Sequence, residues 1–128
     1  MTGLHALIID DDAYSVHIME RLLDQEDISY TAVTDPTRLE ATLQTLEKVD
    51  IVFLDLEMPK LDGYEVLVIL KQHFGNNVPI VACTVHTAEI NTTRKLGFSS
   101  FVAKPLDTDR FPNQLSRILN GDPVWEPR

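Results

Sequence analysis

The chain alternates between short, mainly apolar runs and longer amphipathic segments. The apolar runs are residues 4–9, 30–33, 51–54, 79–83 and 99–103. Between them, apolar residues recur at helical spacing, as they do at Val16, Met19 and Leu23. Runs this short and apolar are typical of buried strands, so the pattern predicts five strands that alternate with helices.

Alternating strands and helices build βαβ units, which predict an α/β fold with a parallel sheet and helices on both faces. Right-handed crossovers leave few layouts, and a five-stranded doubly wound sheet is the natural one. No repeat, low-complexity stretch or long linker divides the chain. We therefore assign one domain to residues 1–121 and a short C-terminal tail to residues 122–128.

Three segments leave structural questions open. The helix expected over residues 87–96 has only Ile90 and Leu96 as apolar anchors, so we expect it to be the least firmly held. The last helix either begins just before Pro112 or has an early turn that this proline disturbs. In the proline-punctuated tail, Trp125 either folds back onto the domain or serves as a docking contact.

The charge balance is strongly acidic, with 11 Lys and Arg against 20 Asp and Glu and a formal net charge of -9. Such a surface repels nucleic-acid backbones and anionic lipids, which argues against direct binding to DNA or membranes. The start of the chain shows no signal-peptide pattern, and the apolar run 66–70 is too short to span a bilayer. We expect a cytoplasmic protein. The single cysteine, Cys83, lies in an apolar run and is expected to be a buried small hydrophobe.

Polar groups of complementary chemistry follow four of the five predicted strands. Sites in doubly wound sheets form beyond the carboxyl ends of the strands, so we expect these groups to converge. In chain order they are Asp10-Asp11-Asp12, Asp55, Thr84 and Lys104-Pro105.

Carboxylates crowded at neighbouring strand ends repel one another, and burial adds to the cost. A hard divalent cation relieves this repulsion, and Mg²⁺ accepts carboxylate oxygens while leaving room for phosphate oxygens. One carboxylate can then attack phosphorus and form an acyl phosphate. Lys104 supplies a positive charge opposite the metal, and Thr84 can donate a hydrogen bond to a phosphoryl oxygen. The set predicts phosphoryl transfer to a carboxylate.

In their order and spacing, these motifs resemble the signature of the bacterial two-component response-regulator receiver domain. Met58-Pro59 and Asp62-Gly63, which follow Asp55, are further points of similarity. The resemblance covers residues 4 to 120, approximately, and is to the stand-alone, chemotaxis-regulator-like type. It implies the flavodoxin-like strand order 2-1-3-4-5.

The resemblance implies that Asp55 is the phosphoacceptor and also a metal ligand. It implies that Asp11 binds Mg²⁺ directly, that Asp10 binds it directly or through a water, and that the backbone carbonyl of Glu57 is a further ligand. The Glu57 side chain either points to solvent or leans toward the metal. Asp12 is left as a helix N-cap or first-turn residue.

The family also implies a switch. Thr84 is its hydroxyl, Lys104 pairs with the phosphoryl group, and the bond between Lys104 and Pro105 is cis. Phe101 lies where the family has its rotating aromatic, with simple core packing as the equal alternative. Most receivers have a small residue after the switch hydroxyl, so we predict that Val85 narrows the approach to the acceptor and slows phosphoryl gain or loss.

These features predict a phosphorylation-dependent signalling switch that takes its phosphoryl group from a sensor histidine kinase or a histidine phosphotransfer protein. It would act through protein contact with a target that the sequence does not name, or by onward phosphorelay, without a DNA-binding output domain. We expect no enzyme activity beyond its own phosphorylation and dephosphorylation.

Two other classes remain as alternatives. A Mg²⁺-dependent phosphatase with an aspartate nucleophile usually has a second acid two residues later, as Glu57 stands to Asp55, but the chain has no room for a substrate-selecting cap. A degenerate receiver that only binds partners is disfavoured by the intact set of acidic, hydroxyl and lysine residues.

Overall fold

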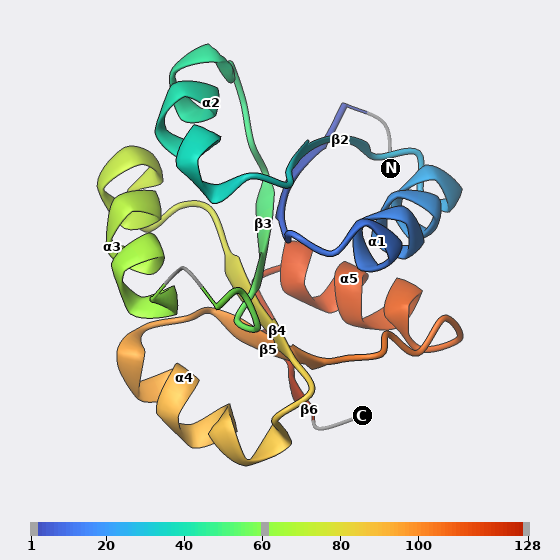
Figure 1. Cartoon of the computed structure of the whole chain (residues 1–128). Helices are drawn as coiled ribbons and strands as arrows, with labels where there is room; N and C mark the ends of the chain where they lie inside the picture. Colours follow the sequence, from blue (N-terminus) through green and yellow to red (C-terminus); the bar gives the residue numbers. More distant parts are fainter. Residues whose placement is uncertain (1–2, 60–61, 127–128) are drawn as a thin grey trace.

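Among the described residues, six strands form a parallel sheet through the centre of the protein, in the order β2-β1-β3-β4-β5-β6 (Figure 1). The computed structural model describes residues 3–59 and 62–126. The first five strands follow the predicted flavodoxin-like order, so the predicted α/β fold is confirmed. The strands are β1 His5–Ile9, β2 Ser29–Val33, β3 Ile51–Asp55, β4 Ile80–Thr84, β5 Ser100–Ala103 and β6 Trp125–Glu126.

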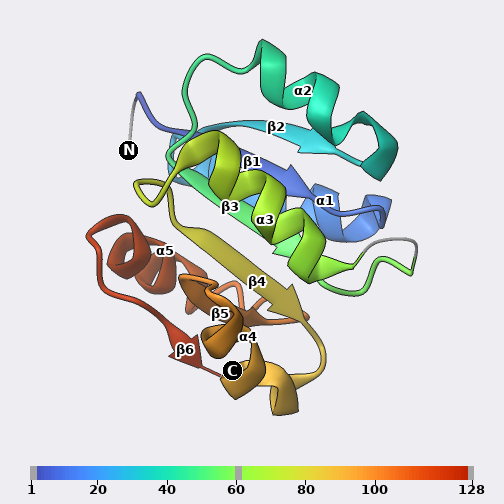
Figure 2. The same cartoon turned by 90° about the vertical axis from the view of Figure 1, so that its left-hand side faces the viewer.

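In the part of the chain that the structure describes, five α-helices cover the two faces of this sheet (Figures 1 and 2). The apolar residues of α1 and α5 pack on one face, and those of α2, α3 and α4 pack on the other. The helices are α1 Ala13–Gln25, α2 Leu39–Thr45, α3 Gly63–Phe74, α4 Ile90–Leu96 and α5 Phe111–Leu119, with short 3-10 turns at Pro36–Arg38 and Thr87–Glu89.

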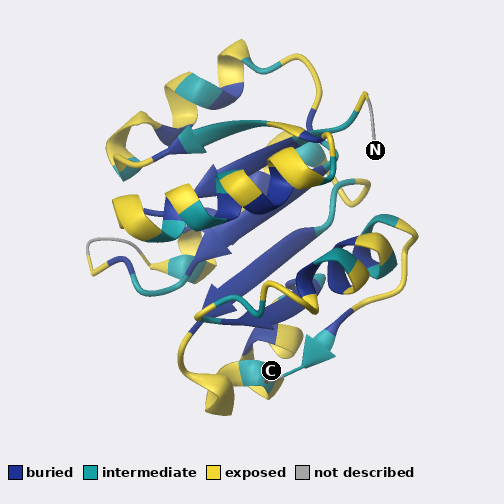
Figure 3. Ribbon diagram, turned by 90° about the vertical axis from the view of Figure 1, so that its right-hand side faces the viewer, coloured by how far each residue is buried: buried dark blue, intermediate teal, exposed yellow. Residues whose placement is uncertain are grey.

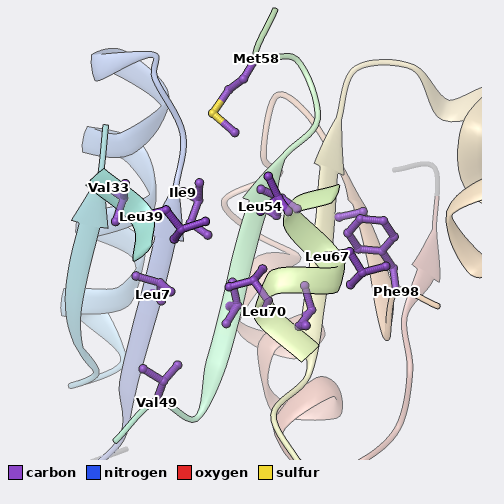
Figure 4. Packing of buried hydrophobic residues seen from close by; sticks show 14 of the residues in the cluster. Leu7, Ile9, Val33, Leu39, Val49, Leu54, Met58, Leu67, Leu70 and Phe98 are labelled. Carbon is purple, nitrogen blue, oxygen red and sulfur yellow. The ribbon is translucent and has the colours of Figure 1, made fainter. Parts of the chain in front are cut away.

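The inner strands β1, β3, β4 and β5 are largely buried, whereas β2 and β6 are only partly buried, and the sheet divides the apolar core into two clusters (Figure 3). In β3, Val52 and Leu54 face the side of α2 and α3, whereas Ile51 and Phe53 face α1 and α5. Figure 4 shows the first cluster, where Leu70 of α3 packs near the β3 side chains. The alternation explains why the inner strands are apolar at most positions, since both of their faces pack against apolar side chains.

Local sequence signals determine where several helices begin and end. Asp12 caps α1, and its carboxylate accepts hydrogen bonds from the amide and hydroxyl of Ser15, as expected for an N-cap. Pro112 stands at the start of α5, which begins at Phe111, so the proline fits the first turn. Gly97 ends α4 with a φ of 110°, a backbone conformation that favours glycine.

The helix expected over 87–96 is present as the Thr87–Glu89 turn followed by α4. Thr93 is its one buried residue, and Ile90 is only partly buried against the core. Leu96, expected as an apolar anchor, is 39% exposed. This helix therefore contributes little apolar surface to the core, although the mobility expected of it stays a prediction.

The tail adds a sixth strand that the sequence pattern did not predict. The amide of Phe101 in β5 donates a 2.7 Å hydrogen bond to the carbonyl of Val124, and β6 continues the parallel pairing. Trp125 therefore folds back onto the domain, where the Arg94 guanidinium lies 4.5 Å from its ring centroid. The last two residues of the tail, 127–128, lie outside the described residues.

Glu126 ties the new strand to α5. Its carboxylate accepts hydrogen bonds at 2.7 Å from both Arg110 and Arg117 and one at 3.3 Å from Gln114. Two residues are too short a run to register as a strand in the sequence, so this element depends on tertiary contacts. Within residues 3–59 and 62–126, no helix is long and apolar enough to cross a membrane.

Candidate functional site

The carboxyl ends of four adjacent strands bring the polar residues together. The pairing aligns Ile9 of β1 with Leu54 of β3, so Asp10, just after β1, lies beside Asp55, the last residue of β3. The same pairing continues across β4 and β5, where Thr84 is aligned with Ala103, the residue before Lys104. The sheet register alone thus places these side chains at one edge.

Three carboxylates form the acidic part of the site. Asp10, Asp11 and Asp55 each offer an oxygen atom, and these atoms all lie within 4.8 Å of one another. Asp10 is 7% exposed and Asp55 only 3%, whereas Asp11 lies at the surface. Hard oxygen ligands around a partly open position match what Mg²⁺ requires, so these residues fit that ion.

Lys104 supplies the positive charge of the site. Its ammonium nitrogen lies 3.2 Å from Asp10 Oδ2 and 3.2 Å from Asp55 Oδ1. Burial would lower the pKa of Lys104, but the two carboxylates together hold that pKa above its usual value. The bond between Lys104 and Pro105 is cis, as the resemblance implied.

Backbone amides hold the two buried carboxylates in place. The Asp12 amide donates to Asp10 Oδ1 at 2.9 Å, and the Glu57 amide donates to Asp55 Oδ1 at 3.0 Å. Burial raises the pKa of Asp10 to about 6, with the nearby charge of Asp55 acting in the same direction. The site thus carries an unfavourable concentration of negative charge that a cation would relieve.

The Glu57 side chain takes neither of the two directions expected for it. Its Oε1 accepts hydrogen bonds from the Thr84 hydroxyl at 2.5 Å and from the Val85 amide at 2.6 Å, and its Oε2 lies 3.4 Å from His86 Nε2. The Glu57 side chain is 28% exposed. Burial opposes its charge, but the two donors and His86 hold the pKa of Glu57 below its usual value.

The remaining predicted residues take different positions. Thr84 and Phe101 are fully buried, and Phe101 belongs to the core cluster that faces α3. The structure thus supports core packing of Phe101, and its role as a rotating switch stays a prediction. Val85 is 53% exposed, and its effect on access to Asp55 also stays a prediction. Cys83 is buried, as expected.

A hollow of about 230 Å³ opens beside the acidic cluster. Its walls are largely apolar and come from β1, β3, β4, α1 and the loop after β5, with Tyr14, Phe53 and Leu106 among them. Asp10, Asp55 and Lys104 line its polar end, so the buried carboxylates are reachable from this side, with the exposed ring of Tyr14 close by.

Comparison with known proteins decides the family. The profile of the response regulator receiver domain matches residues 6–116. The chain belongs to the response regulator receiver family. Receiver domains are phosphorylated by histidine kinases or phosphotransfer proteins and typically bind Mg²⁺ at an acidic pocket, so the chain takes part in phosphorylation-dependent two-component signalling.

Curated relatives come from both eukaryotes and bacteria. Transcription factor SKN7 of Saccharomyces cerevisiae is 31% identical over 121 residues, which cover 91% of this chain and 19% of that protein. Regulatory protein VirG of Agrobacterium fabrum is 32% identical over 117 residues, which cover 89% of this chain and 44% of that protein. The chain thus spans less than half of these relatives. These relatives support membership of the receiver family. That the chain is of the bacterial, stand-alone type stays a prediction.

Solved structures agree on the fold. FixJ from B. japonicum has a TM-score of 0.77 and 31% identity, covering 96% of this chain and 61% of that chain. The chemotaxis response regulator CheY4 of Vibrio cholerae has a TM-score of 0.79 at 19% identity, covering 91% of this chain and 99% of that chain. At 19% identity, the similarity to CheY4 shows the fold alone.

The sequence predicted the residues that cluster, but it did not predict the hydrogen bonds from Thr84 and Val85, at the end of β4, to the Glu57 side chain. The signal was present, since Glu57 stands two residues after Asp55, Thr84 ends the neighbouring strand and Val85 follows it. The rotamer that joins them depends on how the two loops face each other, which a linear pattern does not contain.

Proposed function

We propose that this receiver accepts a phosphoryl group on Asp55, with Mg²⁺ as cofactor, and acts as a phosphorylation switch. The observation that carries the proposal is the position of Asp55. Its carboxylate is almost fully buried at the end of β3, within 3.2 Å of the Lys104 ammonium and beside Asp10 and Asp11. An ordinary acidic residue in an exposed loop would have neither a buried lysine nor further carboxylates beside it.

The proposed step is an in-line phosphoryl transfer. A carboxylate oxygen of Asp55 forms the new O–P bond, and the P–N bond of a phosphohistidine donor breaks. The imidazole, protonated beforehand at its other nitrogen, leaves as neutral histidine with the electron pair of that bond. Lys104 pairs with the phosphoryl oxygens, and Thr84 donates a hydrogen bond to one of them.

Asp10, Asp11, Asp55 and the backbone carbonyl of Glu57 would hold the metal. When bound, Mg²⁺ neutralises charge on the carboxylates and on the phosphoryl oxygens. The chain's own residues do the positioning, because amide donors from Asp12 and Glu57 orient the two buried carboxylates.

The output is proposed to be protein contact or onward relay, within the cytoplasm. Phosphorylation would draw Thr84 inward, and Phe101 with the poorly anchored α4 would then change position. A net charge of -9 favours a protein target with a basic surface over nucleic acid or an anionic membrane. We further propose that the domain catalyses only its own phosphorylation and dephosphorylation.

Intact-protein mass spectrometry after incubation with acetyl phosphate and Mg²⁺ tests the proposal. We expect one added phosphoryl group, lost on omission of Mg²⁺ and absent from Asp55→Asn. Asp12→Asn is the matched control, because asparagine also caps a helix and the variant should label normally. Labelling of Asp55→Asn at the parent level would refute the assignment. Steady turnover of p-nitrophenyl phosphate would instead favour the phosphatase class.

A further inference from the structure

Glu57 connects the two loops that flank the proposed phosphorylation site. One of its oxygens, Oε1, accepts both the Thr84 hydroxyl at 2.5 Å and the Val85 amide at 2.6 Å. The two donors therefore converge on a single point at the end of β4. Convergent donors of this kind form a small anion-binding position, and the carboxylate of Glu57 occupies it.

Both donors are fully used by this contact. A threonine hydroxyl carries one proton, and a backbone amide also carries one. The oxygen of Thr84 meanwhile accepts a 3.0 Å hydrogen bond from the His86 amide, which leaves its single proton for Glu57. Thr84 can donate to a phosphoryl oxygen only after its bond to Glu57 has broken.

The position lies next to the phosphoacceptor. Asp55 is aligned with Cys83, the residue before Thr84, in the pairing of β3 with β4. The backbone amide of Glu57 itself donates to Asp55 Oδ1 at 3.0 Å, so one residue contacts the acceptor with its amide and the switch hydroxyl with its side chain. Thr84 is fully buried, whereas the Glu57 side chain is 28% exposed and has a route into solvent.

We propose that the Glu57 carboxylate is a resident anion that holds the Thr84 hydroxyl and the Val85 amide in the unphosphorylated protein and is displaced when Asp55 carries a phosphoryl group. This inference rests on the proposed function of Asp55. Glu57 then acts as a positioning residue through its side chain. It competes with the phosphoryl group for the same two protons, and its negative charge repels the incoming group.

A purely structural tie would behave differently. If Glu57 only braced the two loops, its removal would loosen the end of β4 and weaken binding of any phosphoryl-like group. As a competitor, Glu57 opposes such binding, so its removal strengthens it. The sign of the effect separates the two roles.

The test uses beryllofluoride, a phosphoryl mimic, titrated into the full chain with Mg²⁺ and followed by amide NMR signals. We expect Glu57→Ala to bind it about tenfold more tightly, because binding no longer has to break a charge-assisted hydrogen bond. Glu57→Gln should also bind beryllofluoride more tightly than the parent, but by a smaller factor. Its amide oxygen can still accept the two hydrogen bonds but carries no charge. Glu89→Gln removes the same charge from a nearby exposed position and should bind like the parent.

Two further measurements make the result specific. Without metal or mimic, the Val85 amide signal should shift and exchange faster with solvent in Glu57→Ala, because it has lost its acceptor. In a Thr84→Val background, Glu57→Ala should increase the affinity for beryllofluoride by a smaller factor, because the Thr84 hydroxyl proton for which Glu57 competes is absent.

The outcomes that overturn the inference are distinct from failure of the proposed function. Unchanged or weaker beryllofluoride binding by Glu57→Ala, or an equal gain in Glu89→Gln, removes the inference while Asp55 stays the acceptor. A parent protein that binds no beryllofluoride and takes no phosphoryl group refutes the proposed function itself.

Discussion

Lys104 Nζ lies 3.2 Å from Asp55 Oδ1, although 49 residues separate the two along the chain. Neither residue could reach the other without the pairing of β3 with β4 and of β4 with β5. The ion pair is largely shielded from water, with the Lys104 side chain 14% and the Asp55 side chain 2% exposed. At this depth charges act more strongly on one another than at the surface.

Removing this cation should slow phosphorylation. Lys104→Met keeps most of the side-chain length but leaves the developing charge on the phosphoryl oxygens without its ammonium partner, so we expect a loss of about 100-fold in rate. The rate of labelling by acetyl phosphate at saturating Mg²⁺ measures it. Lys95→Met, at an exposed position on α4, should label at the parent rate. Equal rates in both variants would contradict a role for Lys104.

Magnesium should stabilise the folded protein through the acidic cluster. At a free Mg²⁺ concentration of about 100 times its dissociation constant, the free energy of unfolding should rise by about 2.7 kcal/mol. Asp11→Asn should remove most of this gain, and because Asp11 is exposed the substitution should cost little without metal. Urea unfolding with and without Mg²⁺ measures this stabilisation. Asp109→Asn, which removes the same charge from an exposed position outside the acidic cluster, is the control. Stabilisation that survives in Asp11→Asn would place the ion elsewhere.

The C-terminal strand should loosen in acid. Hydrogen bonds from Arg117, with further help from Gln114 and Arg110, lower the pKa of Glu126 from its usual 4.5. A group whose folded pKa is lowered stabilises the fold above its usual pKa and loses that contribution as the pH falls through the folded value. Because the protein has one tryptophan, the fluorescence of Trp125 reports on this strand directly.

We expect the Trp125 signal to change as the pH falls below about 4.5, the usual pKa of the Glu126 carboxyl, before the rest of the domain unfolds. Glu126→Gln keeps the shape of the side chain without its charge and should show a weakened strand already at neutral pH. Far-ultraviolet circular dichroism checks that the helices persist. A fluorescence change that coincides with loss of the helices would contradict a separate release of β6.

Cys83 should be inert in the folded protein. Burial raises the pKa of its thiol to about 12, so almost no thiolate exists near neutral pH, and the side chain is only 5% exposed. Iodoacetamide should therefore label Cys83 at the rate of unfolding rather than at the rate of a free thiol. Mass spectrometry after labelling with and without urea measures the rate at which Cys83 is alkylated. Rapid labelling of the native protein would show that β4 opens locally.

The pattern of the sequence was sufficient for the main architecture. Five apolar runs separated by amphipathic segments predicted β1 to β5, because strands inside a sheet with helices on both faces need apolar residues at most positions. The cap at Asp12 and the start of α5 beside Pro112 follow from local backbone chemistry, which acts within a few residues. The same locality explains why Asp10, Asp11, Asp55 and Lys104 were found, since each lies at or just after the carboxyl end of a strand.

What the sequence by itself determined is therefore local: which segments are strands and helices, and which groups stand at their carboxyl ends. Tertiary structure alone decided that Trp125 and Glu126 add a strand beside β5, because that strand is held by its pairing with β5 and by contacts with Arg94 of α4 and Arg117 of α5. It also decided that Glu57 turns to Thr84 rather than to solvent. Side-chain direction depends on which donors lie nearby in space, and these donors, Thr84 and Val85, stand 27 and 28 residues away at the end of β4.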